Sequence, residues 1–377
     1  MKQGAMKVLL LGEYSNVHAT LAEGLRQLGH EVTVASNGDF WKNYPRDIDL
    51  ARPEGRLGGV ALMARIARLL PRLRGYDIVQ LINPVCVELK AARILPLYRY
   101  LRRHNRRVVL GAFGMDYYWV HECCTRMPLR YSDFNLGSTL RTNADALAER
   151  RDWLDTDKGR LNQFVAADCD AVVAGLYEYW ACYHPLFPTK THFIPMPIRP
   201  KTLPPEALCG PAPGAPVRVF IGINRTRSEY KGTDIMLRAA QTVRDRWPGR
   251  MELLVAESVP FAQYVQMMEG SDAIMDQLYS YTPSMNPLEA MSRGIICIGG
   301  GEPENYDILG ERELRPILNV EPTYESVCQV LETLVLHPER IARLKRESVD
   351  YVAHHHDYLR VAARYEALYH RLLSTIP

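Results

Sequence analysis

The most informative stretch of the sequence runs from Ser271 to Asp307 and reads SDAIMDQLYSYTPSMNPLEAMSRGIICIGGGEPENYD. It contains two short apolar runs, Ala273–Met275 and Gly294–Ile298, with the continuous hydrophobicity of strands that are buried on both faces of a parallel sheet. A short helix is expected between these runs. The stretch therefore predicts strand, loop, helix, strand and glycine turn, which is a repeating unit of an α/β fold.

The start of the expected helix carries polar residues. Asn286 suits the N-cap, and Pro287 suits the first helical position. Unpaired N–H groups at a helix start, next to the carboxyl end of a strand, can bind an anion. Glu289, one turn further on, could accept two hydrogen bonds from a vicinal diol. Alternatively, Glu289 closes a capping box with the Asn286 amide, and the spacing alone favours neither interpretation.

The segment LEAMSRG, followed by a strand and by GGGEPE, resembles the donor-site signature of the retaining GT-B glycosyltransferases, above all family four (glycosyltransferases group 1). That pattern has a Glu, seven residues, a second Glu, Ala-Met, and a Gly-x-Pro-Glu turn. The resemblance implies an α/β protein with two Rossmann-like domains that face each other across a cleft, and a nucleotide sugar bound by the second domain. It implies that Glu289 binds the ribose hydroxyls and that the helix start holds the diphosphate through Met285, Asn286, Pro287 and Leu288.

The sequence departs from this pattern at one position. The first Glu of the pattern falls at Tyr281, which we retain as a donor-binding candidate. The missing carboxylate usually faces the donor sugar. Another acid, such as Asp276 or Glu302, could replace it, or the chemistry could be altered or lost.

Composition indicates an ordinary globular protein. A chain of 377 residues fits two domains, and 47% of its residues are apolar and 24% are charged. The net charge of only +3 argues against a general nucleic-acid binder. The eight cysteines are scattered without a CxxC pair, so we expect reduced thiols. Lys7 leads directly into a short strand, and no apolar run reaches 18 residues, so we expect a cytoplasmic protein.

The first half opens with a βαβ pattern: a strand at Met6–Gly12, a helix, and a second strand. The loop after the first strand lacks GxGxxG, which does not support dinucleotide binding, and Gly12 stays a donor-binding candidate at this turn. The arginine-rich segments 61–74 and 97–107 are either solvated helix faces or a basic surface that rests on anionic lipid at the inner face of the cell membrane.

A later strand at Val108–Gly114 places Asp116 at the carboxyl edge of the first sheet, where α/β proteins bind ligands. Asp116 is therefore a candidate catalytic residue that faces the acceptor or the transferred sugar. Its alternative role is a helix cap. Residues 120–165 are expected to be irregular and to shape the acceptor pocket.

Eight prolines between Pro195 and Pro216 predict the domain boundary, because proline continues neither a helix nor a central strand. We expect an acceptor-binding domain at 1–200, a linker at 201–216, and a nucleotide-sugar-binding domain at 217–357. The final helix, 358–377, is expected to return to the first domain.

The second half begins with a buried strand at Val217–Ile223, followed by a loop that carries Arg225, Arg227 and Lys231. Cations this close repel one another unless an anion or solvent separates them. A diphosphate would supply that anion. The resemblance matches Lys231 to the Lys-Gly of the family and favours Arg225 over Arg227 as its arginine. Arg225 and Lys231 are the catalytic candidates of this loop, and Arg227 is a donor-binding candidate.

Together these features predict a retaining, metal-independent hexosyltransferase. Its donor would be a UDP- or GDP-linked sugar, its acceptor a saccharide or lipid-linked saccharide, and its setting the assembly of cell-surface polysaccharide or lipopolysaccharide. No cofactor is expected. No metal is expected either, since the acidic pairs at Asp47–Asp49 and Asp155–Asp157 lack the context of a DxD site. His121, Cys123 and Cys124, like the run His354–His356, are too close in sequence to face one ion. Two alternatives stay open: an inactive partner subunit that binds a nucleotide sugar, and a nucleotide-sugar 2-epimerase.

Overall fold

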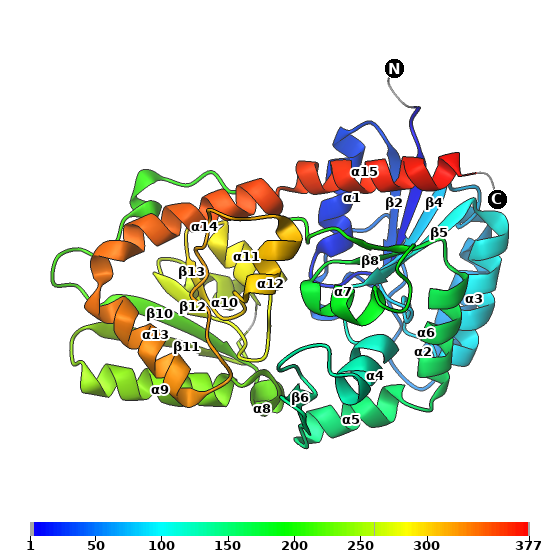
Figure 1. Cartoon of the computed structure of the whole chain (residues 1–377). Coiled ribbons are helices and arrows are strands. Elements are labelled where there is room, and N and C mark those ends of the chain that lie inside the picture. Colours follow the sequence, from blue (N-terminus) through cyan, green and yellow to red (C-terminus); the bar gives the residue numbers. More distant parts are fainter. Residues whose placement is uncertain (1–3, 260, 376–377) are drawn as a thin grey trace. The chain divides into compact units, whose positions relative to one another are not determined.

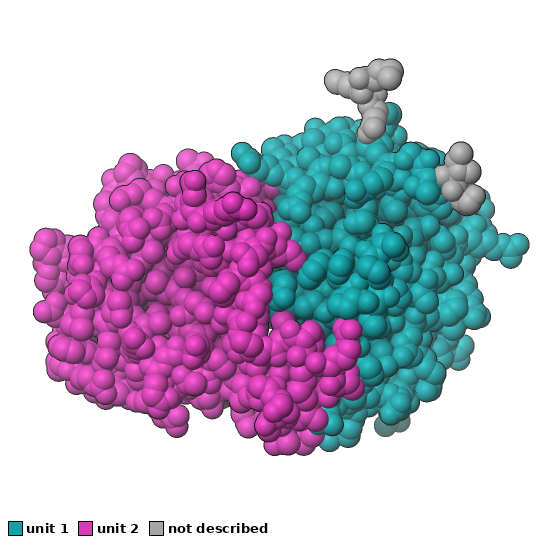
Figure 2. All heavy atoms as spheres, in the orientation of Figure 1, with its two compact units in different colours: residues 1–122, 149–197, 358–377 teal, residues 123–148, 198–357 magenta. Residues whose placement is uncertain are grey.

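The structure is a computed structural model that describes residues 4–259 and 261–375. The chain divides into two compact units (Figure 2). Unit 1 contains the chain up to Glu122, then Glu149–Pro197 and the C-terminal segment from Tyr358. Unit 2 contains Cys123–Ala148 and Ile198–Asp357. Among the described residues, no helix combines the length and the apolar character needed to cross a bilayer.

In the described part of unit 1, a parallel sheet of seven strands has the order β3-β2-β1-β4-β5-β8-β9. At its centre, Leu9 pairs with Thr33 on one side and Val79 on the other. The strands are β1 (Lys7–Leu11), β2 (Glu31–Ser36), β3 (Ile48–Asp49), β4 (Ile78–Leu81), β5 (Arg107–Ala112), β8 (Ala171–Ala174) and β9 (Thr191–Phe193). The helices that lie wholly in unit 1 are α1 (Val17–Gln27), α2 (Gly58–Leu69), α3 (Ala91–His104), α6 (Asp157–Asp168), α7 (Tyr177–Tyr183) and α15 (Tyr358–Ser374). The boundary between the units falls within α4 (Tyr117–Thr125) and within α5 (Ala144–Trp153). The central strands are completely buried, as their continuous apolar runs predict.

The last helix, α15, packs on α1 within unit 1 (Figure 1), which confirms that the chain returns to the first domain. The contact is close at Gly24, where an added Cβ would lie 2.7 Å from the Ala362 Cβ. A buried hydrogen bond of 2.7 Å from the Tyr369 hydroxyl to Gln80 ties α15 to β4.

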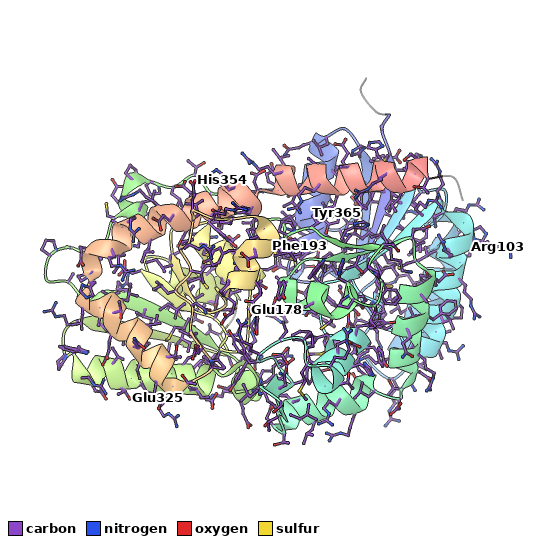
Figure 3. All side chains as sticks on the ribbon, in the orientation of Figure 1. Arg103, Glu178, Phe193, Glu325, His354 and Tyr365 are labelled. Carbon is purple, nitrogen blue, oxygen red and sulfur yellow. The ribbon has the colours of Figure 1, made fainter. Side chains whose placement is uncertain are left out.

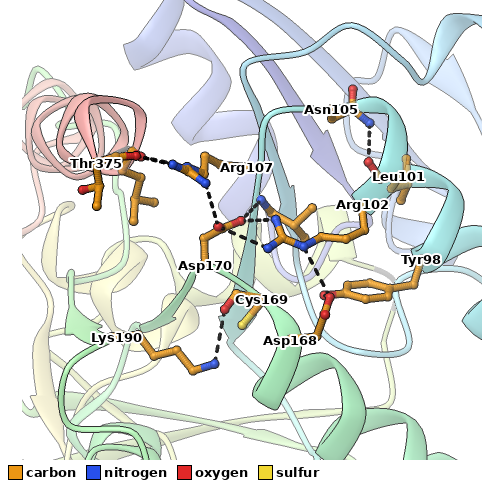
Figure 4. A network of polar contacts seen from close by, with 12 residues as sticks. Tyr98, Leu101, Arg102, Asn105, Arg107, Asp168, Cys169, Asp170, Lys190 and Thr375 are labelled. Atoms are coloured by element: carbon orange, nitrogen blue, oxygen red, sulfur yellow. Dashed lines mark hydrogen bonds and ion pairs between the residues drawn. The ribbon is translucent and has the colours of Figure 1, made fainter. Parts of the chain in front are cut away.

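A polar cluster fixes the far end of α15 (Figure 4). Arg107 donates through Nε to the Leu372 carbonyl at 2.8 Å and also hydrogen-bonds the Thr375 carbonyl. Asp170 accepts from Arg107 and, at 2.5 Å, from Arg102. These arginines lie in the second arginine-rich segment and are bound by unit 1 itself.

In the described part of unit 2, a parallel sheet of four strands has the order β11-β10-β12-β13. Its strands are β10 (Val217–Ile223), β11 (Met251–Glu257), β12 (Ala273–Met275) and β13 (Ile296–Ile298), and a hairpin pairs β6 (Asn135–Leu136) with β7 (Thr139–Leu140). The helices are α8 (Ser228–Lys231), α9 (Thr233–Arg246), α10 (Phe261–Met268), α11 (Met285–Met291), α12 (Pro303–Leu309), α13 (Tyr324–Leu336) and α14 (Ile341–His355).

The structure differs from the expected domain limits in one segment. Residues 123–148 were expected in the first domain, but they pack in unit 2. Residues 120–165 also contain much of α4, α5 and α6, where an irregular loop was expected. The proline-rich connection belongs to unit 2 from Ile198 onward, and its short 3-10 helix, Pro205–Leu208, lies against α14.

Candidate functional site

The candidate site lies at the carboxyl edge of the sheet in unit 2. β10 and β12 are neighbours there, with Ile221 opposite Met275, so the loops that follow both strands emerge together. The loop after β10 leads through a 3-10 turn at Arg225–Arg227 into α8, which ends at Lys231. Asp276 follows β12 directly, and the same loop leads to α11.

Asp276 connects these loops. Its side chain accepts a hydrogen bond of 3.3 Å from Asn286 Nδ2, and the same amide group contacts the Tyr264 hydroxyl at 3.0 Å. Burial raises the pKa of Asp276, while the charge of Lys231 and the Asn286 hydrogen bond act in the opposite direction. Lys231 by its charge and Asn286 by a hydrogen bond therefore both act on one buried carboxylate, although 55 positions separate them in sequence.

A glycine fixes the direction of Lys231. Gly232 ends α8 in the left-handed region, with φ of 74°, and the Lys231 carbonyl accepts from the Leu278 amide at 2.9 Å. An added Cβ at Gly232 would lie 2.6 Å from the Leu278 Cβ. The Lys-Gly pair is thus required for the turn that holds the cation against the loop after β12.

The helix start differs from the sequence-based expectation. α11 begins at Met285 with Ser284 at its N-cap, so Asn286 is not the cap. The Asn286 side chain is instead held by Tyr264 and Asp276. The first helical hydrogen bond runs from the Leu288 amide to the Ser284 carbonyl. This leaves the amides of Met285 and Asn286 ahead of the helical ladder, and Pro287 has no N–H to offer.

Glu289 lies on the exposed side of the same helix and does not close a capping box. Its Oε1 atom is 3.0 Å from Arg293 Nη2 and 3.0 Å from Lys201 Nζ. The side chain is 31% exposed, so a ligand can reach it. Lys201, from the proline-rich connection, and Arg293 are cations next to this carboxylate that the sequence analysis did not single out.

The two arginines of the loop after β10 point elsewhere. Arg225 makes a two-pronged ion pair with Glu257, at 2.5 and 2.9 Å, and its side chain is 75% exposed. The Arg227 guanidinium lies 5.0 Å from the centre of the Tyr230 ring. Neither arginine is held at Asp276, so Lys231 is the cation of this loop that the structure brings to the carboxylate.

Tyr281 and Glu302 lie in internal contacts. Tyr281 is only 1% exposed, and its hydroxyl accepts from the Arg130 amide at 2.6 Å. Glu302 accepts hydrogen bonds from the Tyr131 hydroxyl at 2.5 Å, from Arg130 at 2.6 Å and from Asn319 at 3.0 Å. Glu302 thus accepts from three donors, whereas Asp276 accepts from Asn286 at the edge of the sheet.

In unit 1, a cavity of about 430 Å³ opens at the carboxyl ends of β1, β4 and β5. Its walls combine carboxylates, lysines, aromatic rings and backbone, contributed by Tyr14, Ser15, Asp39, Lys42, Asn83, Val85, Phe113, Gly114, Met115, Glu149, Asp152, Trp153 and Lys158. Asp39 accepts from the Ser15 amide at 2.9 Å and from Lys42 at 2.6 Å, which ties the loops after β1 and β2 together.

The candidate residues of unit 1 lie behind this cavity. Asp116 is completely buried and accepts from the Trp119 amide and the Tyr183 hydroxyl, both at 2.8 Å, so its contacts are those of a cap for α4. Burial raises the pKa of Asp116 to about 7. Gly12 has a φ of 86°, and an added Cβ would lie 2.3 Å from Ile82 Cγ2, so this glycine allows the tight turn after β1.

Among the described residues, His30, Glu366 and His370 form a group whose potential metal-binding atoms lie within 4.8 Å of one another. The Met6 amide donates to His30 Nδ1 at 3.2 Å, which places the ring proton on Nε2, and Nε2 is 3.0 Å from Glu366 Oε1. His30 therefore has no lone pair to offer toward Glu366. The remaining two ligands do not complete a metal site, and the group fits a hydrogen-bonded contact that holds α15.

The comparisons with known proteins agree with this architecture. No family model matches the sequence, and no curated protein matches it either. The chain is similar to sucrose-phosphate synthase from Thermosynechococcus elongatus, with a TM-score of 0.62, 12% identity and coverage of 98% of this chain and 99% of the other. It is also similar to Anabaena Alr3699/HepE in complex with UDP and glucose, with a TM-score of 0.57, 12% identity and coverage of 97% and 100%.

A third solved structure, UDP-GlcNAc 2-epimerase from Neisseria meningitidis bound to UDP-GlcNAc, matches with a TM-score of 0.52, 11% identity and coverage of 97% and 100%. These matches extend over both units. The protein has the GT-B fold, in which parallel sheets flanked by helices form each half and the C-terminal helix returns to the first. Because transferases and an epimerase share this fold, the fold alone does not separate the two chemistries.

Sequence reasoning did not find several residues at this site. Lys201 lies in a segment that was assigned only as a linker, and Tyr264 contacts Asn286 from a helix 22 positions earlier. Arg130 and Tyr131 belong to a segment that was assigned to the other half of the chain. No local pattern marks these residues, since each acts through a partner that is distant in sequence.

Proposed function

We propose that the protein is a glycosyltransferase that transfers a hexose from a nucleoside diphosphate sugar to a saccharide or lipid-linked saccharide, with retention and without a metal ion. Cell-surface polysaccharide or lipopolysaccharide assembly is the proposed setting. The donor would bind at the carboxyl edge of the sheet in unit 2. The UDP bound in the similar HepE structure supports a uridine-linked donor.

The arrangement around Asp276 is the observation that carries this proposal. There the charge of Lys231 and the Asn286 side chain act on one carboxylate, and the loop after that carboxylate leads to the beginning of α11. A diphosphate at this point would receive the ammonium group of Lys231 and the amides of Met285 and Asn286. Because α11 has only seven residues, its dipole is small, and we assign most of the attraction to Lys231.

Glu289 is the proposed ribose ligand. It lies one turn into α11 from the proposed diphosphate site and is accessible beside Lys201 and Arg293. A carboxylate can accept hydrogen bonds from both hydroxyls of a ribose.

The proposed chemistry requires stabilisation of the leaving group. When the bond between the sugar and the phosphate breaks, its electron pair goes to the diphosphate oxygen, and negative charge develops there. Lys231 and the amides of Met285 and Asn286 would stabilise that charge without moving, because Asp276, Asn286 and Gly232 hold them in position. An acceptor hydroxyl that attacks from the face of the departing phosphate would give retention.

We propose the cavity of unit 1 as the acceptor site, with Asp116 in a positioning role. Its carboxylate orders the start of α4 directly after Met115, which lines the cavity. Contact with anionic lipid, if the acceptor is membrane-linked, would involve α2 rather than α3. On α3, Arg102 is bound by Asp170, and only outward residues such as Arg103 face solvent (Figure 3). The beginning of α2 instead exposes Leu57 and Val60, at 75% and 62%.

The test is a panel of nucleotide sugars, with product analysis and calorimetric binding of UDP and GDP. A transferase predicts slow donor hydrolysis in the absence of acceptor and diphosphate binding that weakens in Lys231→Ala and in Glu289→Ala. Conversion of the donor to its 2-epimer would instead identify an epimerase. Binding without either reaction would identify an inactive partner subunit. Wild-type affinity in both variants would refute the assignment of the donor site.

A further inference from the structure

The segment Cys123–Ala148, which we call the strap, lies in sequence between two parts of unit 1 but packs in unit 2 (Figure 2). It contains the β6–β7 hairpin, and Figure 1 shows β6 next to α8. The hairpin is small, so contacts of individual side chains must hold the strap in place. Those contacts fall into two groups, and both lie on loops at the carboxyl edge of the sheet in unit 2.

The first group centres on Arg141. Its guanidinium donates to the Glu229 carbonyl at 2.9 Å and to the Tyr230 carbonyl at 3.2 Å. These carbonyls belong to α8, the helix that ends at Lys231. A cation is favoured at the C-terminal end of a helix, where carbonyls lack helical partners.

Two further contacts reinforce this group. The Arg141 guanidinium lies 3.6 Å from the centre of the Tyr279 ring, which belongs to the loop after Asp276. The Tyr230 hydroxyl donates to Asp133 of the strap at 2.6 Å. Arg141 thus bridges the loop that carries Lys231 and the loop that carries Asp276.

The second group centres on Arg130 and Tyr131. The Arg130 amide donates to the Tyr281 hydroxyl, and the Tyr131 ring lies 4.8 Å from the Tyr281 ring. Glu302, in the turn after β13, accepts from both strap residues. Tyr281, which replaces the first glutamate of the family pattern, is therefore a residue on which the strap docks.

We propose that the strap is part of the donor site and that Arg141 is a positioning residue for Lys231. Arg141 holds the last turn of α8 against the Tyr279 loop, and this fixes the point from which Lys231 reaches toward a diphosphate. The proposal rests on the proposed function, because it assumes that Lys231 binds the donor. The ligand class is a nucleoside diphosphate, alone or linked to a sugar.

The experiment compares Arg141→Ala with Arg218→Ala as a matched control. Like Arg141, Arg218 donates to a backbone carbonyl, that of Gly270 at 2.9 Å, and it pairs in addition with Glu252 at 3.1 Å. Arg218 lies at the opposite, amino end of β10, far in the strand from the loop that carries Lys231. We expect Arg141→Ala to weaken calorimetric UDP or GDP binding ~10- to 100-fold, as misplacement of a binding group does, and Arg218→Ala to leave it unchanged.

A double-mutant cycle separates positioning from general damage. If Arg141 acts through Lys231, then Arg141→Ala costs little additional affinity in the Lys231→Ala background. Weak binding in that background can be measured by ligand-observed NMR. Equal losses in both backgrounds would overturn the proposal, and so would wild-type affinity of Arg141→Ala.

Two further outcomes are informative. If Arg141→Ala does not fold, Tyr230→Phe removes only the hydroxyl that donates to Asp133. A loss of UDP or GDP affinity in Tyr230→Phe supports the proposed role of the strap, and wild-type affinity refutes that role. If the wild-type protein binds neither UDP nor GDP, the proposed function fails and this proposal fails with it. If the wild-type protein and Arg141→Ala bind the nucleotide but Lys231→Ala does not, the proposed function stands and only the positioning role of Arg141 is rejected.

Discussion

The charge of Lys231 acts on the buried Asp276, and this gives two separate predictions, one for binding and one for stability. Lys231→Ala removes the cation that faces the proposed diphosphate. A hydrogen bond to a charged group contributes about 1.5–3 kcal/mol, so the Kd for a nucleoside diphosphate should rise roughly 10- to 150-fold. Isothermal titration calorimetry measures this directly.

The same substitution leaves Asp276 with less charge compensation. The residue is 9% exposed, and burial already raises its pKa. The Lys231 charge acts on Asp276 without a direct ion pair, and water screens it because Lys231 is half-buried. Its loss should therefore cost less than the about 3–5 kcal/mol of a broken buried ion pair. We therefore expect Lys231→Ala to lower the free energy of unfolding by ~1–3 kcal/mol at pH 7 in urea denaturation.

The double variant Lys231→Ala with Asp276→Asn separates these effects. An asparagine at 276 keeps an oxygen for the Asn286 amide but removes the buried charge, so it should restore most of the lost stability. It should not restore nucleotide affinity, because the cation is still absent. Asp276→Asn alone keeps Lys231 and should keep measurable binding. Recovery of affinity in the double variant would falsify the assignment of Lys231 as the diphosphate ligand.

Three further predictions concern other parts of the molecule. Burial raises the pKa of Asp116 from 3.8 to about 7, so the folded state binds the carboxyl proton more tightly than the unfolded state. The free energy of unfolding should therefore fall as the pH rises from about 4 to 7, by at most ~4 kcal/mol. Asp116→Asn should flatten this pH dependence in urea melts between pH 4 and 8. Gly232→Ala should destabilise the protein more than Gly249→Ala. Both glycines have a positive φ, which costs a side-chain-bearing residue ~1–2 kcal/mol, but of the two only Gly232 has atoms in the path of an added Cβ. Thermal melts of the two variants therefore separate the cost of the clash from the cost of the backbone conformation. Tyr369→Phe removes the hydroxyl that donates to buried Gln80, should cost about 1–3 kcal/mol, and should speed amide exchange in α15, as measured by mass spectrometry.

The sequence predicted the strands well because they are continuous apolar runs. Val217–Ile223 and Ala273–Met275 match β10 and β12 residue for residue. The resemblance assigned the loop with Lys231 and the helix start at Asn286 to one diphosphate, and the structure has the loops after the adjacent strands β10 and β12 at one edge of the sheet. The predicted N-cap role of Asn286 was wrong, because Ser284 is the cap and the Asn286 side chain contacts Tyr264, which lies on another helix.

The position of the strap could not be predicted from the sequence, because its contacts are distant in sequence. The hydrogen bonds of Arg141 to Glu229 and Tyr230 span 88 and 89 positions. The neighbouring helix α5 reads ADALAERRDW and lacks a regular apolar stripe, so periodicity did not predict it either. Local patterns report which face of an element is buried, whereas they carry no information about which of two units buries it.

The contacts around Tyr281 explain why a tyrosine fits where the family pattern has a glutamate. Burial, and to a smaller extent the charges of Glu304 and Glu302, raise the pKa of the Tyr281 hydroxyl to about 12, while Arg130 acts in the opposite direction and forms ion pairs with both acids. A glutamate at 281 would add a third negative charge around a single arginine, in a position that is 1% exposed. A tyrosine adds no charge, accepts the Arg130 amide, and packs under the Arg130 guanidinium at 4.9 Å. The tyrosine at position 281 and the docking of the strap are therefore two aspects of one arrangement, in which Arg130 of the strap neutralises the acids of the glycine turn.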